Sequence, residues 1–118
     1  MNKKELGKIG EEFALDYFKK KGFEICERNY RTHFGEIDLI VKKKNLLIFI
    51  EVKTRKSLKF GEPIEAVDER KQEKIRFIAD YYLAKIKNKS LQVRFDVFSI
   101  ILDKDNKISS WEHIPNAF

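Results

Sequence analysis

The chain has 118 residues, and 25 Lys and Arg side chains against 19 Asp and Glu give it a formal net charge of +6. This length suits one domain, and a hydrophobic content of 42% with ten Phe can form a buried core, which excludes disorder along the whole chain. No apolar run is long enough for a membrane span, we expect no signal peptide, and the single cysteine, Cys26, excludes a disulfide framework. We therefore expect a cytoplasmic domain.

The first half of the chain predicts one helix followed by three strands. A helix is expected over 3–21, because apolar residues recur at spacings of three and four from Leu6 to Tyr17 and Gly22 follows. Turn residues and alternation then divide the next segment into strands. The strands are expected over 23–31, 36–42 and 46–54, with a hairpin turn at 42–45.

The strand over 46–54 begins with five apolar residues, LLIFI, without alternation. Such a run is typical of a strand that is buried on both faces. A second helix from about 68 to about 87, with Asp68 as its N-cap, and strands over 91–101 and 107–114 complete the chain. We expect an α/β fold in the order α-β-β-β-α-β-β, in which helices flank a central mixed β-sheet and the last strand lies at an edge.

Two charged residues follow the apolar run of the central strand. Glu51 and Lys53 are two residues apart, so they point to the same face of the sheet. Burying an unpaired charge costs several kcal/mol, so these groups need partners, a metal ion or a solvent-filled cleft. Two interpretations stay open from this strand alone: an ion pair between the two residues, or a functional site.

Asp38 interrupts the preceding strand, where aspartate is disfavoured. A turn centred near Lys44 pairs the two strands antiparallel and brings Asp38 within one or two residues of Glu51. Two carboxylates with a lysine beside them make an oxygen-rich site, and such donors suit Mg²⁺ or Mn²⁺ better than zinc.

The first helix offers a third carboxylate, from either Glu11 or Glu12. Glu12 has charged residues one turn away on both sides, whereas Glu11 has small and apolar neighbours. We therefore prefer Glu11 as the functional acid. The alternative is a partly exposed glutamate that the helix dipole stabilises.

Positive charge is concentrated in residues 54–90, which hold ten basic and six acidic side chains. A basic surface beside acidic groups attracts phosphates, although a solvated lysine-rich surface has the same composition. The candidate nucleic-acid-binding residues are Arg28, Arg31, Arg55, Lys56, Lys59 and Lys71. Tyr30 and Phe34 lie near two of them and are candidates for stacking on a base.

Three other polar groups are interpreted as structural. Arg94 and Asp96 share one strand face and predict an ion pair. His33 and His113 have no partners at ligand spacing, so we expect neither in the site, and Cys26 is expected to pack within its strand.

Several motifs together carry a family resemblance. The segment Gly10-Glu11-Glu12, the run GEIDLI from Gly35 and the run FIEVKTR to Arg55 resemble the YraN-like family of small bacterial proteins, which are predicted to be nucleases. That family looks like a member of the restriction-endonuclease-like superfamily and is similar to archaeal Holliday junction resolvases. The resemblance covers nearly the whole chain, from about 7 to about 101, and no key position departs from the pattern.

The resemblance implies a restriction-endonuclease-like core with a metal-dependent phosphodiesterase site. Asp38 and Glu51 would ligate Mg²⁺ or Mn²⁺, and Glu11 would complete or orient the site. Lys53 would position or polarise the attacking water and stabilise negative charge on the phosphate.

The leading functional prediction is an endonuclease that acts on DNA, with branched or structured DNA as the substrate by analogy with resolvases. Two alternatives stay open: a nucleic-acid-binding module that is non-catalytic or needs a partner for cleavage, and an RNA-processing nuclease. Resolvase-like enzymes act as dimers, which implies a homodimer, although the sequence has no clear apolar dimer seam.

Overall fold

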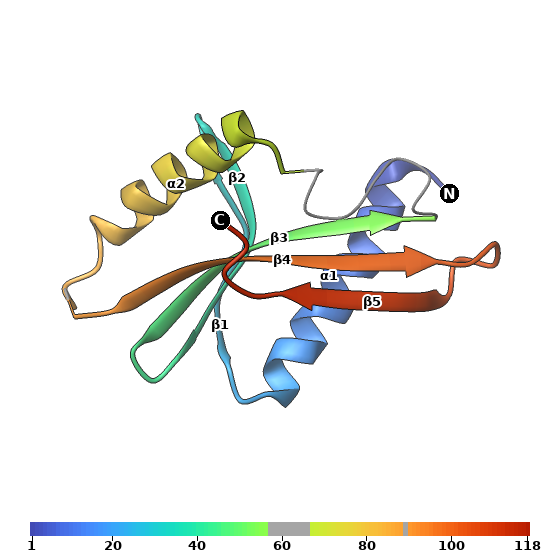
Figure 1. Ribbon diagram of the computed structural model, residues 1–118, viewed down its shortest axis with the longest axis horizontal. Coiled ribbons are helices and arrows are strands. Elements are labelled where there is room, and N and C mark those ends of the chain that lie inside the picture. The colour runs from blue at the N-terminus through green and yellow to red at the C-terminus, as the bar shows by residue number, and fades with distance from the viewer. Residues whose placement is uncertain (57–66, 89) are drawn as a thin grey trace.

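The structure is a computed structural model that describes residues 1–56, 67–88 and 90–118. Its five-stranded mixed sheet is flanked by two helices in the predicted order, and only the central pair of strands, β3 and β4, runs parallel (Figure 1). The strands lie side by side in chain order, so β5 is at an edge, as predicted. The elements are α1 (Lys3–Lys20), β1 (Glu24–Thr32), β2 (Gly35–Lys43), β3 (Leu46–Arg55), α2 (Glu69–Leu83), β4 (Gln92–Leu102) and β5 (Ile108–Ile114).

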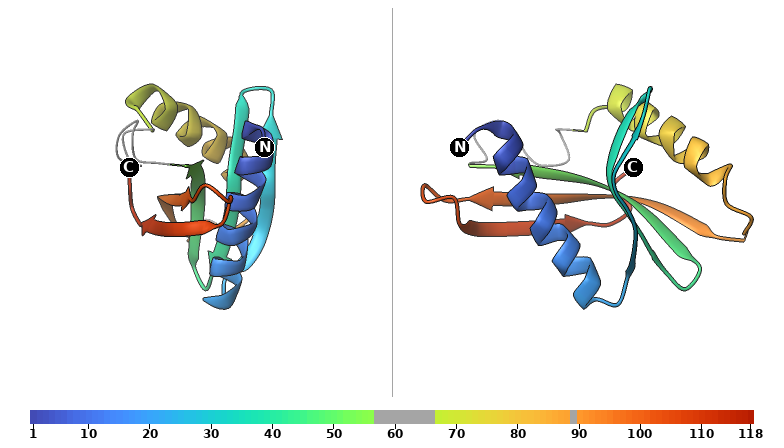
Figure 2. Two further views of the ribbon diagram at one scale, coloured as in Figure 1. Left: turned by 90° about the vertical axis from the view of Figure 1, so that its right-hand side faces the viewer. Right: turned by 180° about the vertical axis from the view of Figure 1, so that it is seen from behind.

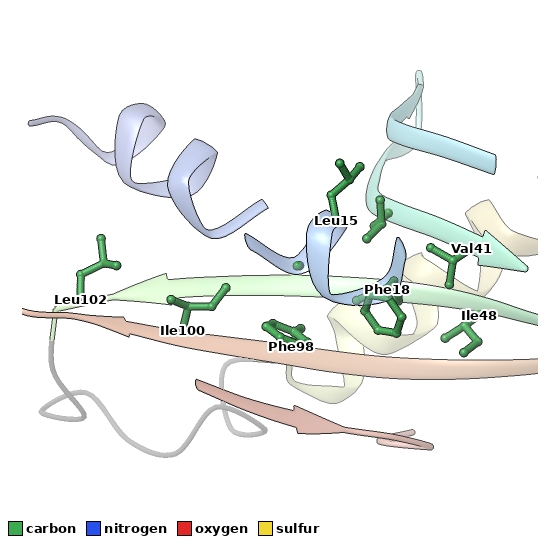
Figure 3. Packing of buried hydrophobic residues seen from close by; sticks show 10 residues of the cluster. Leu15, Phe18, Val41, Ile48, Phe98, Ile100 and Leu102 are labelled. Carbon is green, nitrogen blue, oxygen red and sulfur yellow. The ribbon is translucent and has the colours of Figure 1, made fainter. Parts of the chain in front are cut away.

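The two helices cover opposite faces of the sheet (Figure 2). On β3, Ile48 and Ile50 pack toward α1, in the cluster shown in Figure 3, whereas Leu47 and Phe49 pack toward α2. The continuous apolar run of β3 is thus buried on both faces, as its pattern predicts. The same alternation directs Glu51 toward the α2 side of the sheet.

Helix α1 begins at an Asn2 cap, whose side chain accepts a hydrogen bond from the Glu5 backbone at 2.9 Å. Gly10 lets the helix approach β3 closely, because a Cβ atom there would lie 1.7 Å from the Thr54 hydroxyl oxygen. The helix therefore crosses the sheet near the end of β3, which fixes the position of Glu11, the next residue.

Helix α2 has the predicted N-cap but is shorter than predicted. The Asp68 side chain accepts a hydrogen bond from the Lys71 backbone at 2.9 Å. The helix ends at Leu83 rather than near residue 87, because the chain tightens into turns in which Lys85 and Ile86 donate backbone hydrogen bonds three residues back. Ile86 still packs against the apolar cluster beneath α2.

The remaining boundaries differ from the predictions by at most one residue. Lys44 has a φ of 55° in the tight turn between β2 and β3, and Cys26 packs against the α2-side cluster as predicted. No helix in the described part of the chain is long and apolar enough to cross a membrane.

Candidate functional site

Two carboxylates face each other where β2 and β3 separate. The ladder pairs Leu39 with Ile50, so Asp38 and Glu51 are the next facing positions, which is the proximity that the sequence predicts. Asp38 does not continue the ladder through its backbone; its carboxylate instead accepts a hydrogen bond from the Val52 backbone at 2.8 Å. The side chains of Asp38 and Glu51 therefore meet on the α2 side of the sheet.

The surroundings shift the pKa values of these two carboxyl groups in opposite directions. Burial, together with a hydrogen bond to Glu51 and the charge of Glu51, raises the pKa of Asp38 to about 9. Burial also opposes ionisation of Glu51, but hydrogen bonds from Asp38 and Lys71 outweigh it and lower the pKa of Glu51. Asp38 is therefore the acid of the pair that keeps its proton more readily, and Glu51 is the one that ionises more readily.

Two lysines approach this pair. The Lys71 ammonium, from the first turns of α2, lies 2.8 Å from the Glu51 carboxylate. The direct ion pair of Glu51 is thus with Lys71, which the sequence placed among the phosphate contacts, whereas one sequence-based alternative paired Glu51 with Lys53. Lys53 lies beside Lys71, and burial and that neighbouring ammonium lower the pKa of Lys53.

Glu11 lies next to this group but not within it. It is half-buried with a raised pKa, because burial outweighs a hydrogen bond from Asn29, and its charge contributes to the raised pKa of Asp38. Glu12 is exposed and forms an ion pair with Arg28, so of the two acids Glu11 is the one directed toward the fold. Among residues 1–56, 67–88 and 90–118, no three His, Cys, Asp or Glu side chains are grouped closely enough to hold a metal ion.

A cleft of about 400 Å³ opens over the carboxylates, and we call it the acidic cleft. Its lining residues come from β2, β3 and α2. They are Gly35, Glu36, Asp38, Glu51, Val52, Lys53, Lys71, Lys74, Ile75 and Ile78.

Two basic pockets adjoin the acidic cleft. The first, of about 360 Å³ between α1 and β1, shares Glu36 with the cleft, and we call it the helix pocket. The second, of about 530 Å³ at the end of β3, shares Val52 and Lys53 with the cleft, and we call it the strand-end pocket. Both pockets include Lys3 and Gly7, so cations border the cleft on two sides.

The predicted nucleic-acid-binding residues divide between these pockets. Arg28 and Arg31 line the helix pocket, and Arg31 pairs with Glu36 at 3.0 Å. Arg55 and Lys56 line the strand-end pocket, whereas Lys59 lies outside the described residues. Four further lysines, which the sequence pattern did not indicate, also line the three hollows: Lys3, Lys4, Lys8 and Lys74. The packing of α1 and α2 on the sheet brings these lysines to the pockets, and no local sequence pattern predicts that packing.

A second charged network surrounds Asp96 on β4. Both Arg94 nitrogens that face Asp96 donate to it, at 2.9 and 2.8 Å, which confirms the predicted ion pair. His113 is also a partner, with its Nε2 atom 2.7 Å from Asp96 and its Nδ1 atom 3.1 Å from the Tyr17 hydroxyl. His113 thus joins β5 to β4 and α1, a structural role that its sequence context did not indicate.

The donor atoms of the acidic cleft fit a hard divalent cation. Asp38 and Glu51 contribute carboxylate oxygens from facing positions, and such oxygens are the ligands that a hard cation prefers. Mg²⁺ or Mn²⁺ bound there would favour the ionised form of both groups.

Comparison with known proteins places the chain among close relatives. The model of the family described as "Uncharacterised protein family UPF0102" matches residues 10–100. A UPF0102 protein of Dictyoglomus thermophilum is 54% identical over 118 residues, the full length of both chains. UPF0102 proteins of Caldicellulosiruptor saccharolyticus and Clostridioides difficile are 45% and 44% identical, also over the full length of both chains.

Proposed function

This chain belongs to the UPF0102 family, as the YraN-like motifs of its sequence predict, and we propose that it is a metal-dependent endonuclease that hydrolyses phosphodiester bonds in DNA. One observation carries the proposal: Asp38 and Glu51 face each other beneath a cleft that three lysines also line. The raised pKa of Asp38, which burial and the neighbouring Glu51 cause, supports this pair as a functional site, because perturbed pKa values cluster at such sites.

Four residues of the acidic cleft, and Glu11 beside it, have proposed tasks. Asp38 and Glu51 would hold the cation, which would activate the attacking water and offset negative charge on the phosphate. Lys53, at the end of the same strand, donates hydrogen bonds to the attacking water or to a phosphate oxygen. Lys71 keeps Glu51 ionised and oriented through its 2.8 Å contact. Glu11 orients the surrounding groups from α1. The reaction adds water across one P–O bond and leaves a phosphate end and a hydroxyl end.

The basic pockets suggest how a nucleic acid lies on this face. The helix pocket and the strand-end pocket both adjoin the acidic cleft, so a backbone that crosses the cleft meets cations before and after the scissile phosphate. The resemblance to Holliday junction resolvases extends the proposal to a restriction-endonuclease-like core, a branched or structured DNA substrate, a cytoplasmic site of action and a homodimer.

The test combines cation binding with cleavage. Calorimetric titration with Mn²⁺ should show a site in the wild type that is lost in Asp38→Asn, while Asp80→Asn, which removes an exposed carboxylate on α2, should bind Mn²⁺ like the wild type. Cleavage of junction, duplex, single-stranded DNA and RNA is then compared in Mg²⁺, Mn²⁺ and EDTA. Equal Mn²⁺ affinity in wild type and Asp38→Asn would place the cation elsewhere and contradict the proposal.

A second function is favoured by the small number of acids that are grouped closely enough to bind a cation. Because no third acid joins Asp38 and Glu51 within the described residues, the pair alone offers few ligands, and substrate or a partner protein would have to supply more. In that case the protein is a nucleic-acid-binding module that cleaves only with a partner. Mn²⁺ binding that requires an added oligonucleotide, without cleavage by the isolated chain, would favour this function.

A further inference from the structure

Three exposed aromatic side chains gather at the rim of the acidic cleft. Phe34, Phe77 and Tyr81 have relative exposures of 42%, 54% and 45%. The ring centroid of Phe34 lies 4.9 Å from that of Phe77 and 6.4 Å from that of Tyr81. We call these three residues the aromatic platform. Large apolar groups that remain together in water indicate a binding surface.

The platform is fixed to the wall of the cleft. Gly35, the residue after Phe34, has a φ of +135°, and a Cβ atom there would lie 2.9 Å from Lys74 and 3.2 Å from Ile78. The turn between β1 and β2 therefore rests directly on α2. Gly35, Lys74 and Ile78 all line the acidic cleft, so the platform continues the wall of the cleft outward.

Lysines border the platform on both sides. Lys74, Phe77 and Tyr81 follow one another along one stripe of α2 at spacings of three and four, over about 10 Å of helix. Beyond them, the Lys85 ammonium lies 4.5 Å from the centre of the Tyr81 ring. Aromatic faces that alternate with cations are typical of surfaces on which the bases of a single strand stack while its phosphates are neutralised.

The same charges disfavour a second copy of the chain as the occupant. Lysine is depleted in the cores of protein–protein interfaces, and here lysines stand at both ends of the row of rings. The lysines beside the rings would also repel the same lysines of a second copy placed on this surface, whereas a nucleic acid is attracted. Charge complementarity thus selects a polyanion that has exposed ring faces.

We infer that the aromatic platform binds unpaired nucleobases, so that the preferred substrate carries a single-stranded segment next to the phosphate in the acidic cleft. This inference rests on the proposed function for the position of that phosphate. Bases within a continuous duplex are stacked on each other and do not present their faces to the platform. The inference therefore distinguishes single strands, flaps and branch points from an intact blunt duplex.

The experiment measures binding without cleavage. Fluorescence anisotropy in EDTA compares a labelled single-stranded oligonucleotide with a blunt duplex of the same sequence, for the wild type and Phe77→Ala. Loss of one stacked base should weaken single-strand binding about 10-fold, within the range of 1–3 kcal/mol for each base–aromatic contact. Duplex binding should change less than about twofold, since phosphate contacts dominate there.

Three further variants separate ring stacking from apolar contact. Phe77→Tyr keeps the ring face and should bind the single strand like the wild type, whereas Phe77→Leu keeps an apolar side chain and should bind as weakly as Phe77→Ala. Ile108→Ala trims an exposed apolar residue on β5, away from the platform, and should have no effect. Thermal melting of each variant confirms that the fold is intact.

Two outcomes would overturn the inference. If Phe77→Leu binds the single strand like the wild type, ring stacking is not the interaction. The second outcome is that sedimentation finds a dimer for the wild type but a monomer for Phe77→Ala, while the substitution weakens binding of the single strand and of the duplex equally. The platform would then be an interface between copies. Failure of the proposed function is recognised separately: Phe77-dependent binding would persist in EDTA, but no cleavage would follow on adding Mg²⁺ or Mn²⁺.

Discussion

Two aspartates near the centre of the sheet, the buried Asp96 and the half-buried Asp38, have opposite surroundings. Asp96 has no exposed surface and accepts hydrogen bonds from Arg94, His113 and the Asn116 backbone. Burial opposes its ionisation, but these partners outweigh burial and lower the pKa of Asp96. Asp38 accepts one backbone hydrogen bond and faces another carboxylate, and its pKa rises to about 9.

The difference is that the fold supplies Asp96 with a full set of hydrogen-bond and ion-pair partners but supplies Asp38 with few. The partners of Asp96 hold the end of the chain against β4, and they stabilise its charge without a bound ion. The pair of Asp38 and Glu51 has only Lys71 as a direct ion-pair partner, which is consistent with the proposed cation site. We expect substitutions at Asp96 to alter stability and substitutions in the acidic cleft to alter activity.

The largest expected effect is on catalysis at Lys53. Lys53→Met keeps most of the aliphatic stem, and Lys71 still pairs with Glu51, so the variant should fold and bind nucleic acid. Single-turnover cleavage should fall by about 10²–10³, the scale for losing one preorganised electrostatic group. Melting, binding and cleavage are measured on the same preparation. Cleavage at the wild-type rate by folded Lys53→Met would show that Lys53 is not catalytic.

Substitution of Asp96 should have the opposite effects, a loss of stability with little change in cleavage. Asp96→Asn turns an amide toward groups that donate hydrogen bonds and leaves Arg94 without its carboxylate. Urea unfolding should show a loss of about 3 kcal/mol, the lower end for a broken buried ion pair, because the Arg94 side chain is 27% exposed. Cleavage per folded molecule should stay within about twofold of the wild type. A large loss of cleavage in folded Asp96→Asn would break the proposed division between the two acids.

The next prediction concerns how the stability of the folded chain depends on pH through Asp38. The folded pKa of Asp38 is about 9 against an ordinary value of 3.8, so between these values only the folded chain holds the proton. Its contribution to stability is full at low pH and is lost as pH rises through about 9. In EDTA the wild type should lose about 1–2 kcal/mol relative to Asp38→Asn between pH 5 and pH 8, less than the full linkage value because the cleft admits water.

Added Mn²⁺ provides the control for this experiment. The cation should restore the stability of the wild type at pH 8 and leave Asp38→Asn unchanged, because only the wild type keeps both carboxylates. Urea midpoints at both pH values check the result. Parallel pH profiles for the two proteins in EDTA would mean that Asp38 does not hold a proton in the folded chain.

The smallest expected effect concerns the helix pocket. Replacing Lys4 and Lys8 by Ala should flatten the salt dependence of duplex binding, and the log–log slope should fall by about 0.9 for each phosphate that the variant no longer neutralises. The matched control replaces Lys19 and Lys20 by Ala, which removes the same charge from the other end of α1. Equal slopes for the two double variants would show that net charge matters and that the helix pocket has no specific role.

The sequence by itself determined the elements and the acids of the cleft. The apolar run before Glu51 identified a strand buried on both faces. The short turn at Lys44 placed Asp38 within one or two residues of Glu51, because hairpin register follows from turn length, and the structure makes the two positions directly facing. The small and apolar neighbours of Glu11 and the charged neighbours of Glu12 separated the two helix acids correctly. These features are local: periodicity, register and helix spacing are all contained in short stretches of chain.

Only the tertiary structure decided how distant segments meet. The partner of Glu51 is Lys71 from α2 rather than Lys53 two residues away, and His113 reaches Asp96 from the last strand. The aromatic platform likewise joins the turn at Phe34 to α2, residues that no local pattern connects. Such contacts depend on how each helix docks on the twisted sheet, and that docking follows from packing of the two apolar clusters as a whole rather than from any short stretch of sequence.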